Sequence, residues 1–326
     1  MKKIFIRLVK ALGYEIIDQN NFVSPTLDKE INEDLSNFND SSIVLPLGEV
    51  KITRKIKSLL IVFRTNTSVE IWDQNKKRLF EYPKIEYATR SLNSLIKSIK
   101  YLREKLPEIN TKLFILDDHS DSVNLEKIKK ISKLEKNSEV ISLNHDNYKS
   151  VIEEQESKET FSNLASLLNS FEVGKDHGED LVFFVEDDYL HFETMLEEMI
   201  SSFQRISSQL GKDIFMCPSD YPYLYMGNDK TNILIGSKRH WRTIDKTLCT
   251  FLTSKTLINK YWDNFKKTCE KRHDPFEKYL NEIYHKEICI SPIKSLSLHL
   301  TNINSSYGLA PFINYKELWE DNQIHN

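Results

Sequence analysis

From residue 58 onward, short apolar runs alternate with longer amphipathic segments. Strands that alternate with helices form βαβ units, which build a parallel sheet. We therefore predict an α/β protein with a mainly parallel central sheet flanked by helices. The predicted strands of this part are the runs at 58–63, 112–116, 139–143 and 180–185. The predicted helices are the amphipathic segments at 88–106, 123–132 and 160–171.

The order is less regular after residue 190. There we predict a loop at 218–242, and otherwise shorter elements judged by the same periodicity. The predicted helices lie at 192–210, 255–270 and 275–285. The predicted strands lie at 213–217, 247–253 and 295–300.

The first 14 residues predict a basic amphipathic helix. Apolar residues such as Ile4, Leu8 and Leu12 recur at helical spacing, and Lys and Arg occupy the remaining surface. Such a helix binds an anionic membrane face, or packs on its own domain or a second subunit, and the sequence leaves these alternatives open. Residues 15–55 are polar, apart from a predicted strand at 42–47, and we interpret them as a linker or peripheral layer.

Composition excludes several functions. The 45 Lys and Arg residues against 48 Asp and Glu give a net charge of -3, which argues against a nucleic-acid partner. The four cysteines lack zinc-finger spacing and are interpreted as reduced thiols. Because no apolar run has the length of a membrane span or a secretory signal, we expect a cytoplasmic protein. The eight glycines form no dinucleotide or P-loop motif.

Two predicted strands end in acids. KLFIL runs into Asp117 and Asp118, and DLVFFV runs into Glu186, Asp187 and Asp188. Ligands of parallel sheets bind beyond the carboxyl ends of the strands. Adjacent carboxylates repel one another unless a cation or polar ligand neutralises them, and oxygen ligands suit Mg²⁺ or Mn²⁺. The alternative is that both clusters cap the following helices.

A phosphatase of the haloacid-dehalogenase type also begins with acids at a strand end. It requires DxDx[TV] after the apolar run, whereas here the run is followed by DDHS. The second carboxylate is at the wrong position, so this reading is excluded.

The order of features resembles glycosyltransferase family 2, whose members have the Rossmann-like GT-A fold. LLIVF followed by RTN takes the place of the first strand and its nucleotide-contacting loop, and ILDDHSDS takes the place of an aspartate-rich turn. The resemblance spans residues 58–300. It implies that Arg64, Thr65 and Asp117 or Asp118 bind a nucleotide-sugar donor.

The run FFVEDDY matches the metal-binding D-x-D of that family, with Glu186 first and Asp188 second. Glutamate at the first position is a departure, so Asp188 is the expected metal ligand, and Glu186 and Asp187 are assigned to the nucleotide sugar. The closing run ICISPIKSLSLH ends in His299, which the resemblance implies as a further ligand of Mn²⁺ or Mg²⁺. The alternative is an ordinary surface histidine.

The segment HDPFE falls where the family has an acidic pair before a short helix. The resemblance implies that Asp274 is the general base that deprotonates the acceptor hydroxyl. Asp274 is also a good N-cap with Pro275 at the first helical position, and both roles are compatible.

The segment at 220–242 is rich in aromatic and basic residues. Tyr and Trp stack on sugars, and Arg binds acidic groups, so we predict an acceptor site with Asp220, Tyr223, Arg239 and Trp241. A partly buried aromatic layer with a solvated basic run is the alternative.

These observations predict a metal-dependent glycosyltransferase of the EC 2.4 class, and the resemblance implies that it acts with inversion. The expected acceptor is a glycan or lipid-linked glycan in bacterial surface polysaccharide synthesis at the inner membrane face. The alternatives are a nucleotidyltransferase, which normally has a glycine-rich first loop, and a non-catalytic GT-A-like module. We predict a peripheral segment at 1–55, a donor half at 56–190, an acceptor half at 191–300 and a tail at 301–326.

Overall fold

The computed structural model describes residues 2–14, 41–44, 48–68, 78–227 and 231–324. The chain separates into two compact units, Met1–Ile52 and Thr53–Asn326. The first contains helix α1 (Lys2–Ala11) and an antiparallel hairpin of β1 (Ser41–Val44) and β2 (Gly48–Lys51). A hairpin therefore replaces the single strand predicted at 42–47. Most of the predicted linker lies outside the described residues.

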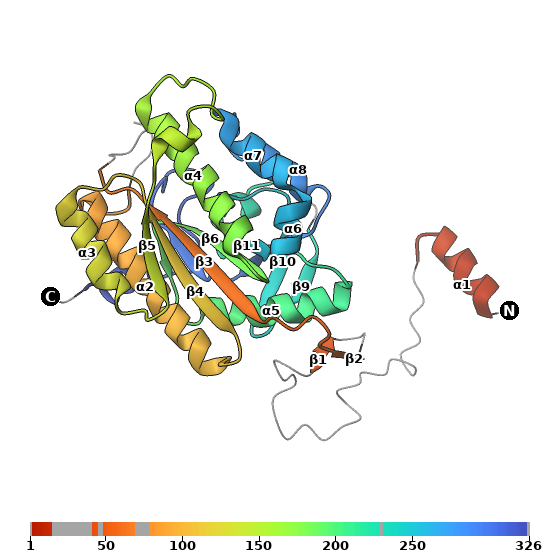
Figure 1. Ribbon diagram of the computed structural model, residues 1–326. Helices are drawn as coiled ribbons and strands as arrows, with labels where there is room; N and C mark the ends of the chain where they lie inside the picture. Colours follow the sequence, from red (N-terminus) through yellow and green to blue (C-terminus); the bar gives the residue numbers. More distant parts are fainter. Residues whose placement is uncertain (1, 15–40, 45–47, 69–77, 228–230, 325–326) are drawn as a thin grey trace. The chain divides into compact units, whose positions relative to one another are not determined.

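The second unit is built on a sheet with the strand order β5-β4-β3-β6-β11-β8-β12-β10-β9 (Figure 1). Strands β5, β4, β3 and β6 are mutually parallel, and β6 then pairs with β11 in the antiparallel direction. The predicted α/β class with a large central sheet flanked by helices is confirmed. The strands are β3 (Ser58–Thr65), β4 (Asn110–Asp117), β5 (Ser138–Ser142), β6 (Leu181–Glu186), β8 (Phe215–Met216), β9 (Ile233–Ile235), β10 (His240–Ile244), β11 (Phe251–Ser254) and β12 (Cys289–Ile293).

A second, two-stranded sheet pairs β7 (Tyr189–His191) with β13 (Ser297–His299). The helices of this unit are α2 (Lys84–Lys105), α3 (Ser122–Ser132), α4 (Lys158–His177), α5 (Met195–Leu210), α6 (Lys255–Lys260), α7 (Trp262–Glu270), α8 (Lys278–Tyr284) and α9 (Tyr315–Glu320), with the 3-10 turns η2 (His145–Tyr148) and η3 (Pro222–Tyr225). Helices α2, α3 and α4 follow β3, β4 and β5 in the order expected of βαβ units, whereas α6, α7 and α8 follow one another without an intervening strand. Among the described residues, no helix has the length and apolar character needed to cross a membrane.

Helix α4 covers the parallel part of the sheet (Figure 1). Leu60 and Val62 of β3 and Phe184 of β6 belong to one apolar cluster with Phe171 of α4 and Phe265 of α7. The alternating side chains of β3 are also buried, so this strand is covered on both faces. Its nearly continuous apolar sequence is explained by that double burial.

The register of the parallel strands sets the position of the polar residues that follow them. Arg64 lies opposite Glu186 across the β3 and β6 pair, and Thr65 lies opposite Asp117 across the β3 and β4 pair. The carboxyl ends of three strands therefore meet at one edge of the sheet. Because β7 follows directly and pairs with β13, His299 is brought opposite Tyr189 and beside this edge.

Several predictions for the second half were wrong in detail. The predicted loop at 218–242 contains β9 and most of β10, and the predicted helix at 255–270 is divided into α6 and α7. The strand predicted at 295–300 is the short β13, the closing run at 288–299 contains both β12 and β13, and β7 and α9 were not predicted. Elements as short as β7 and α9 carry too few residues for a periodic pattern to identify them.

Gly174 allows α4 to approach β6 closely. A Cβ atom at this position would lie 2.6 Å from Cε1 and Cζ of Phe184 and 3.0 Å from Cγ1 of Val182. We expect Gly174→Ala to lower the free energy of unfolding by about 1–2 kcal/mol, because overpacking outweighs the gain in helix propensity. Chemical denaturation measures this, with the exposed Asp176→Ala on the same helix as control. Equal or higher stability of Gly174→Ala would contradict the close packing.

His191 is buried, and this burial lowers its pKa from 6.5 to about 3. Its Nδ1 atom lies 2.7 Å from the Ser297 hydroxyl. Above pH 6.5 both the folded and unfolded chains carry a neutral imidazole, so stability is unaffected. Below pH 6.5 the imidazole of His191 binds a proton in the unfolded chain but not in the folded chain. The free energy of unfolding therefore falls as the pH falls toward 3.

We expect the wild-type protein to lose about 2–3 kcal/mol more stability than His191→Leu between pH 6.5 and pH 4.5. Urea unfolding at the two pH values measures the difference. An equal loss in both proteins would show that His191 does not contribute to acid sensitivity.

Candidate functional site

A pocket of about 790 Å³ opens at the carboxyl edge of the parallel strands. This volume lies within the range of small-molecule sites. Most of the predicted donor, metal and catalytic residues line it, although they are widely separated in the sequence. They are Arg64, Thr65, Asp118, Glu186, Asp187, Asp188, Asp274 and His299.

Each of the three consecutive acids has a cation from a different element. Arg64 Nη2 of β3 lies 2.5 Å from Glu186 Oε1, and Lys84 Nζ at the start of α2 pairs with Asp187 Oδ1. His299 Nε2 of β13 lies 3.3 Å from Asp188 Oδ2. The mutual repulsion that the sequence predicts is thus offset by protein cations even without a metal ion.

Asp188 and His299 favour each other's charged form. Burial opposes ionisation of the Asp188 carboxyl, but the His299 imidazolium outweighs burial and lowers the pKa of Asp188. Burial likewise opposes the charge on His299, and Asp188 raises the pKa of His299. His299 is further fixed by Nδ1, which lies 3.0 Å from the Tyr307 carbonyl oxygen, and by stacking on Tyr189 with ring centroids 4.8 Å apart.

Within the described part of the chain, one oxygen of Asp188 lacks a hydrogen-bond partner of normal geometry. Oδ1 is buried and makes no hydrogen bond of normal length and angle with any described residue, although Thr301 lies close enough to favour the charged carboxylate. Buried polar atoms usually have a partner, so this oxygen indicates a ligand. An oxygen ligand beside an imidazole fits the Mn²⁺ or Mg²⁺ that the resemblance implies.

Asp187 anchors the turn after β3. Its Oδ2 accepts a hydrogen bond of 2.8 Å from the Thr65 hydroxyl and one of 3.3 Å from the Asn66 backbone N–H. The Asn66 side chain in turn donates to Asp118 Oδ2 at 3.3 Å. Asn66 therefore bridges the acidic clusters at the ends of β4 and β6.

Asp117 and Asp118 lie in different surroundings. Burial raises the pKa of Asp117, whose Oδ2 accepts a 3.3 Å hydrogen bond from the Ser120 backbone N–H and which does not line the pocket. Asp118 does line the pocket and also accepts a hydrogen bond from Ser162 of α4. Of the two, only Asp118 is placed to reach a ligand there, and its predicted role in donor binding remains untested.

Asp274 is exposed at the rim of the same pocket. The alternative that it caps a helix at Pro275 was wrong, because α8 begins at Lys278 and Glu277 occupies its N-cap position. Glu277 also lines the pocket. Two neighbouring carboxylates, Asp274 and Glu277, therefore line the same pocket as Asp188, and the role of Asp274 as base stays a prediction.

The four predicted acceptor residues do not line this pocket. Asp220 is buried in an ion pair with Arg242, and Tyr223 donates a 2.5 Å hydrogen bond to the Lys246 carbonyl oxygen. Trp241 is buried and donates to Glu198, whereas Arg239 lines a separate cavity of about 420 Å³. Asp220, Tyr223 and Trp241 have the contacts of packed side chains, and an acceptor role for all four residues stays a prediction.

Sequence reasoning missed several residues of the site. Lys84 is the first residue of α2, where a positive charge interacts unfavourably with the helix dipole. A lysine at this position indicates that its charge has another partner. Arg78 also lines the pocket, since a bridge to Thr301 holds its backbone beside β13. Asn66 and Glu277 lie within the RTN and HDPFE segments that the sequence pointed to but were not singled out there, and Ser162 carries no comparable signal in the sequence.

No family model matches the chain, and no curated protein matches it. Similar solved structures include the galactosyltransferase LgtC in complex with donor and acceptor sugar analogues, at 12% identity and a TM-score of 0.33 over 69% of this chain and 70% of that one. They also include S. aureus TarS, at 16% identity and a TM-score of 0.39 over 72% of this chain and 35% of that one.

A further similar structure is UDP-glucose pyrophosphorylase complexed with UDP-glucose, at 10% identity and a TM-score of 0.37 over 73% of this chain and 90% of that one. Because all three TM-scores lie below 0.5, the function proposed below depends on the residues of this chain alone.

The Arg64 and Glu186 pair is expected to stabilise the edge of the sheet. Its side chains are 13% and 22% exposed, so removal of the cation leaves a largely buried carboxylate. We expect Arg64→Met to lower the free energy of unfolding by about 2–3 kcal/mol. Combining it with Glu186→Gln should cost clearly less than the sum of the two single changes, as measured by a double-mutant cycle of urea unfolding. Additive losses would contradict a direct pair.

Proposed function

We propose that this chain is a metal-dependent glycosyltransferase that moves a sugar from a nucleotide-diphosphate donor to an acceptor hydroxyl. The observation that carries the proposal is the buried Oδ1 atom of Asp188, which makes no hydrogen bond of normal geometry with the described residues and whose side chain lines the pocket at the carboxyl edge of the parallel strands. This edge is where sheets of this class bind nucleotides. Asp188 and His299 are the proposed ligands of Mn²⁺ or Mg²⁺.

Two cationic side chains of the pocket are suited to bind the diphosphate of the donor. Arg78 and Lys84 both line the pocket and are suited to hold the oxygens of a diphosphate. Arg64 stays with Glu186 and keeps the end of β3 in place. On the other side of Thr65, Asn66 and Asp118 offer an amide and a carboxylate to a ribose or a base.

A bound divalent cation would supply charge stabilisation to the departing diphosphate. Asp274 would accept the proton of the attacking hydroxyl, and Glu277 is the second, neighbouring carboxylate of the pocket. Direct displacement by that hydroxyl inverts the anomeric centre. The acceptor we propose is a glycan or lipid-linked glycan of bacterial surface polysaccharide, reached from the cytoplasmic face of the inner membrane.

Peripheral membrane contact through residues 1–14 belongs to this proposal. Helix α1 carries Lys2, Lys3, Arg7 and Lys10 beside its apolar residues. This composition is typical of helices that lie on anionic lipid surfaces. It would bring the enzyme close to a lipid-linked acceptor.

A donor screen tests the proposed reaction. Purified protein is incubated with a panel of nucleotide sugars and with Mn²⁺, Mg²⁺ or EDTA, and nucleoside diphosphate release is measured. We expect metal-dependent turnover of at least one donor. In Asp188→Asn we expect the rate of turnover to fall by at least about 100-fold, because loss of a metal ligand lowers activity at least as much as loss of a residue that only orients a ligand. The exposed Asp176→Asn is the matched control and should keep full activity.

Other outcomes contradict the proposal. Release of pyrophosphate from a nucleoside triphosphate and a sugar phosphate would identify a nucleotidyltransferase instead. Binding of a glycan without metal-dependent turnover of any donor would identify a non-catalytic module. Full activity of Asp188→Asn would exclude the proposed metal ligand.

The roles of the two carboxylates Asp274 and Glu277 can be tested separately. If Asp274 is the base, Asp274→Asn should lower kcat by about 10²–10⁴-fold with little change in donor KM, whereas Glu277→Gln should retain most of kcat. Steady-state kinetics with a fixed acceptor measure both. The reverse result would assign the base to Glu277.

A further inference from the structure

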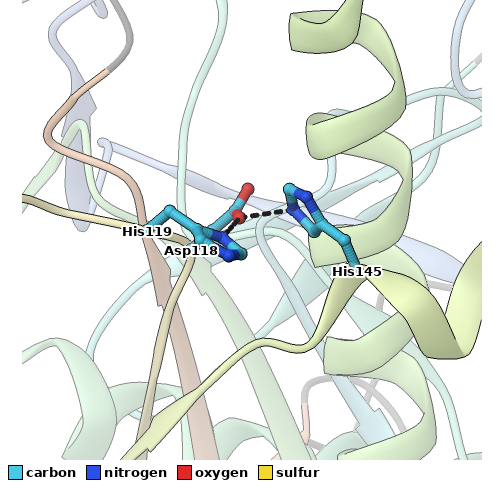
Figure 2. A group of neighbouring side chains, drawn as sticks. All are labelled: Asp118, His119 and His145. Carbon is cyan, nitrogen blue, oxygen red and sulfur yellow. Dashed lines mark hydrogen bonds and ion pairs between the residues drawn. The ribbon is translucent and has the colours of Figure 1, made fainter.

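A second polar cluster lies at the end of β4, on the other side of Asn66 from Asp188. His145 Nε2 lies 2.7 Å and His119 Nδ1 lies 2.9 Å from the same oxygen of Asp118, Oδ1. Figure 2 shows both imidazoles pointing toward this carboxylate, His119 from the turn after β4 and His145 from the start of η2. Three potential ligand atoms from three residues lie within 4.8 Å of one another.

These separations are close to those of ligands that share one ion. Donor atoms bound at about 2.0–2.2 Å with tetrahedral or octahedral angles lie about 2.8–3.6 Å apart. The separations of 2.7 Å and 2.9 Å from Asp118 Oδ1 fit this range after a small opening. The two facing nitrogens, which lie within 4.8 Å of each other, must come within the same range. Two imidazole nitrogens and one carboxylate oxygen suit Zn²⁺ or Co²⁺ better than Mg²⁺ or Ca²⁺, which prefer oxygen ligands.

The surroundings hold the carboxylate in a fixed orientation. Asp118 is buried, and its other oxygen, Oδ2, accepts hydrogen bonds from the Ser162 hydroxyl and the Asn66 amide. Partners of this kind on the far oxygen orient a metal-binding carboxylate. Oδ1 is thereby left to face the two histidines.

The two histidines are positioned by their own segments. His119 has a φ of 60°, an uncommon conformation for a residue other than glycine, in which its ring lies beside Asp118. His145 begins η2, and its ring packs edge-on against Phe161 with centroids 5.6 Å apart. The His119 side chain is 58% exposed, so an ion and its remaining water ligands reach the cluster from solvent.

We propose that Asp118, His119 and His145 form a binding site for a divalent transition-metal ion such as Zn²⁺, distinct from the site at Asp188. The ion would link the turn after β4 to η2 and stabilise this corner of the molecule. The alternative is a purely hydrogen-bonded triad in which both imidazoles donate to Asp118. In the metal site, the two imidazole nitrogens that face Asp118 must both be unprotonated. In the hydrogen-bonded triad, both of these nitrogens carry a proton.

Titration of the metal-free, full-length protein with Co²⁺ tests the site, with visible absorption as the signal and Zn²⁺ as competitor. We expect saturable binding that weakens at least tenfold in His119→Ala and in His145→Ala. The exposed His285→Ala is the matched control, and Asp188→Asn controls for the other site. His285→Ala should bind Co²⁺ as the wild-type protein does, and Asp188→Asn should keep the part of the binding that depends on His119 and His145. No donor is present, so this result is independent of the proposed glycosyl transfer.

A second variant keeps the test valid if alanine disturbs the fold. The amide of His145→Gln can still donate a hydrogen bond to Asp118 but is a poor ligand of Zn²⁺. We expect this variant to keep the melting temperature of the metal-free protein and to lose the increase that Zn²⁺ produces in the wild type. No saturable Co²⁺ binding by the wild-type protein, or unchanged binding in both histidine variants, would overturn the proposal in favour of the hydrogen-bonded triad.

Discussion

Three carboxylates in consecutive positions repel one another, and the fold stabilises them with a cation for each. The cations come from β3, from the first turn of α2 and from β13, so the end of β6 ties together segments that lie far apart in the chain. Loss of any one pairing would leave a carboxylate in surroundings with little water. The geometry of the whole pocket depends on this neutralisation.

This pairing changes how the acidic cluster is interpreted. In the sequence, the repulsion between Glu186, Asp187 and Asp188 was itself the argument for a metal ion. In the structure, Arg64 and Lys84 satisfy the first two acids, and Asp187 mainly supports the turn at Thr65. The argument for a metal now depends on one oxygen of Asp188, which is a narrower and more easily tested basis.

The sequence predicted the parallel half of the fold well, because buried parallel strands such as β3 and β6 form continuous apolar runs and their carboxyl ends must share an edge. It also placed Asp118, Asp188 and His299 at that edge. It could not find His145, which comes 27 residues after Asp118 and meets it only through the packing of η2. The segment at 218–242, predicted as a loop, contains β9 and most of β10, because strands this short give no clear periodic pattern in the sequence.

Asn66 connects the acidic clusters at the ends of β4 and β6. Its backbone N–H is held by the cluster of β6, and its side chain by the cluster of β4. A ligand that shifts one end of this short bridge changes the energy of the other end. Thermodynamic reciprocity then requires that two ligands bound on either side alter each other's affinity by the same factor, whichever binds first. A single asparagine thus gives the two halves of the pocket a route for cooperative or competitive binding.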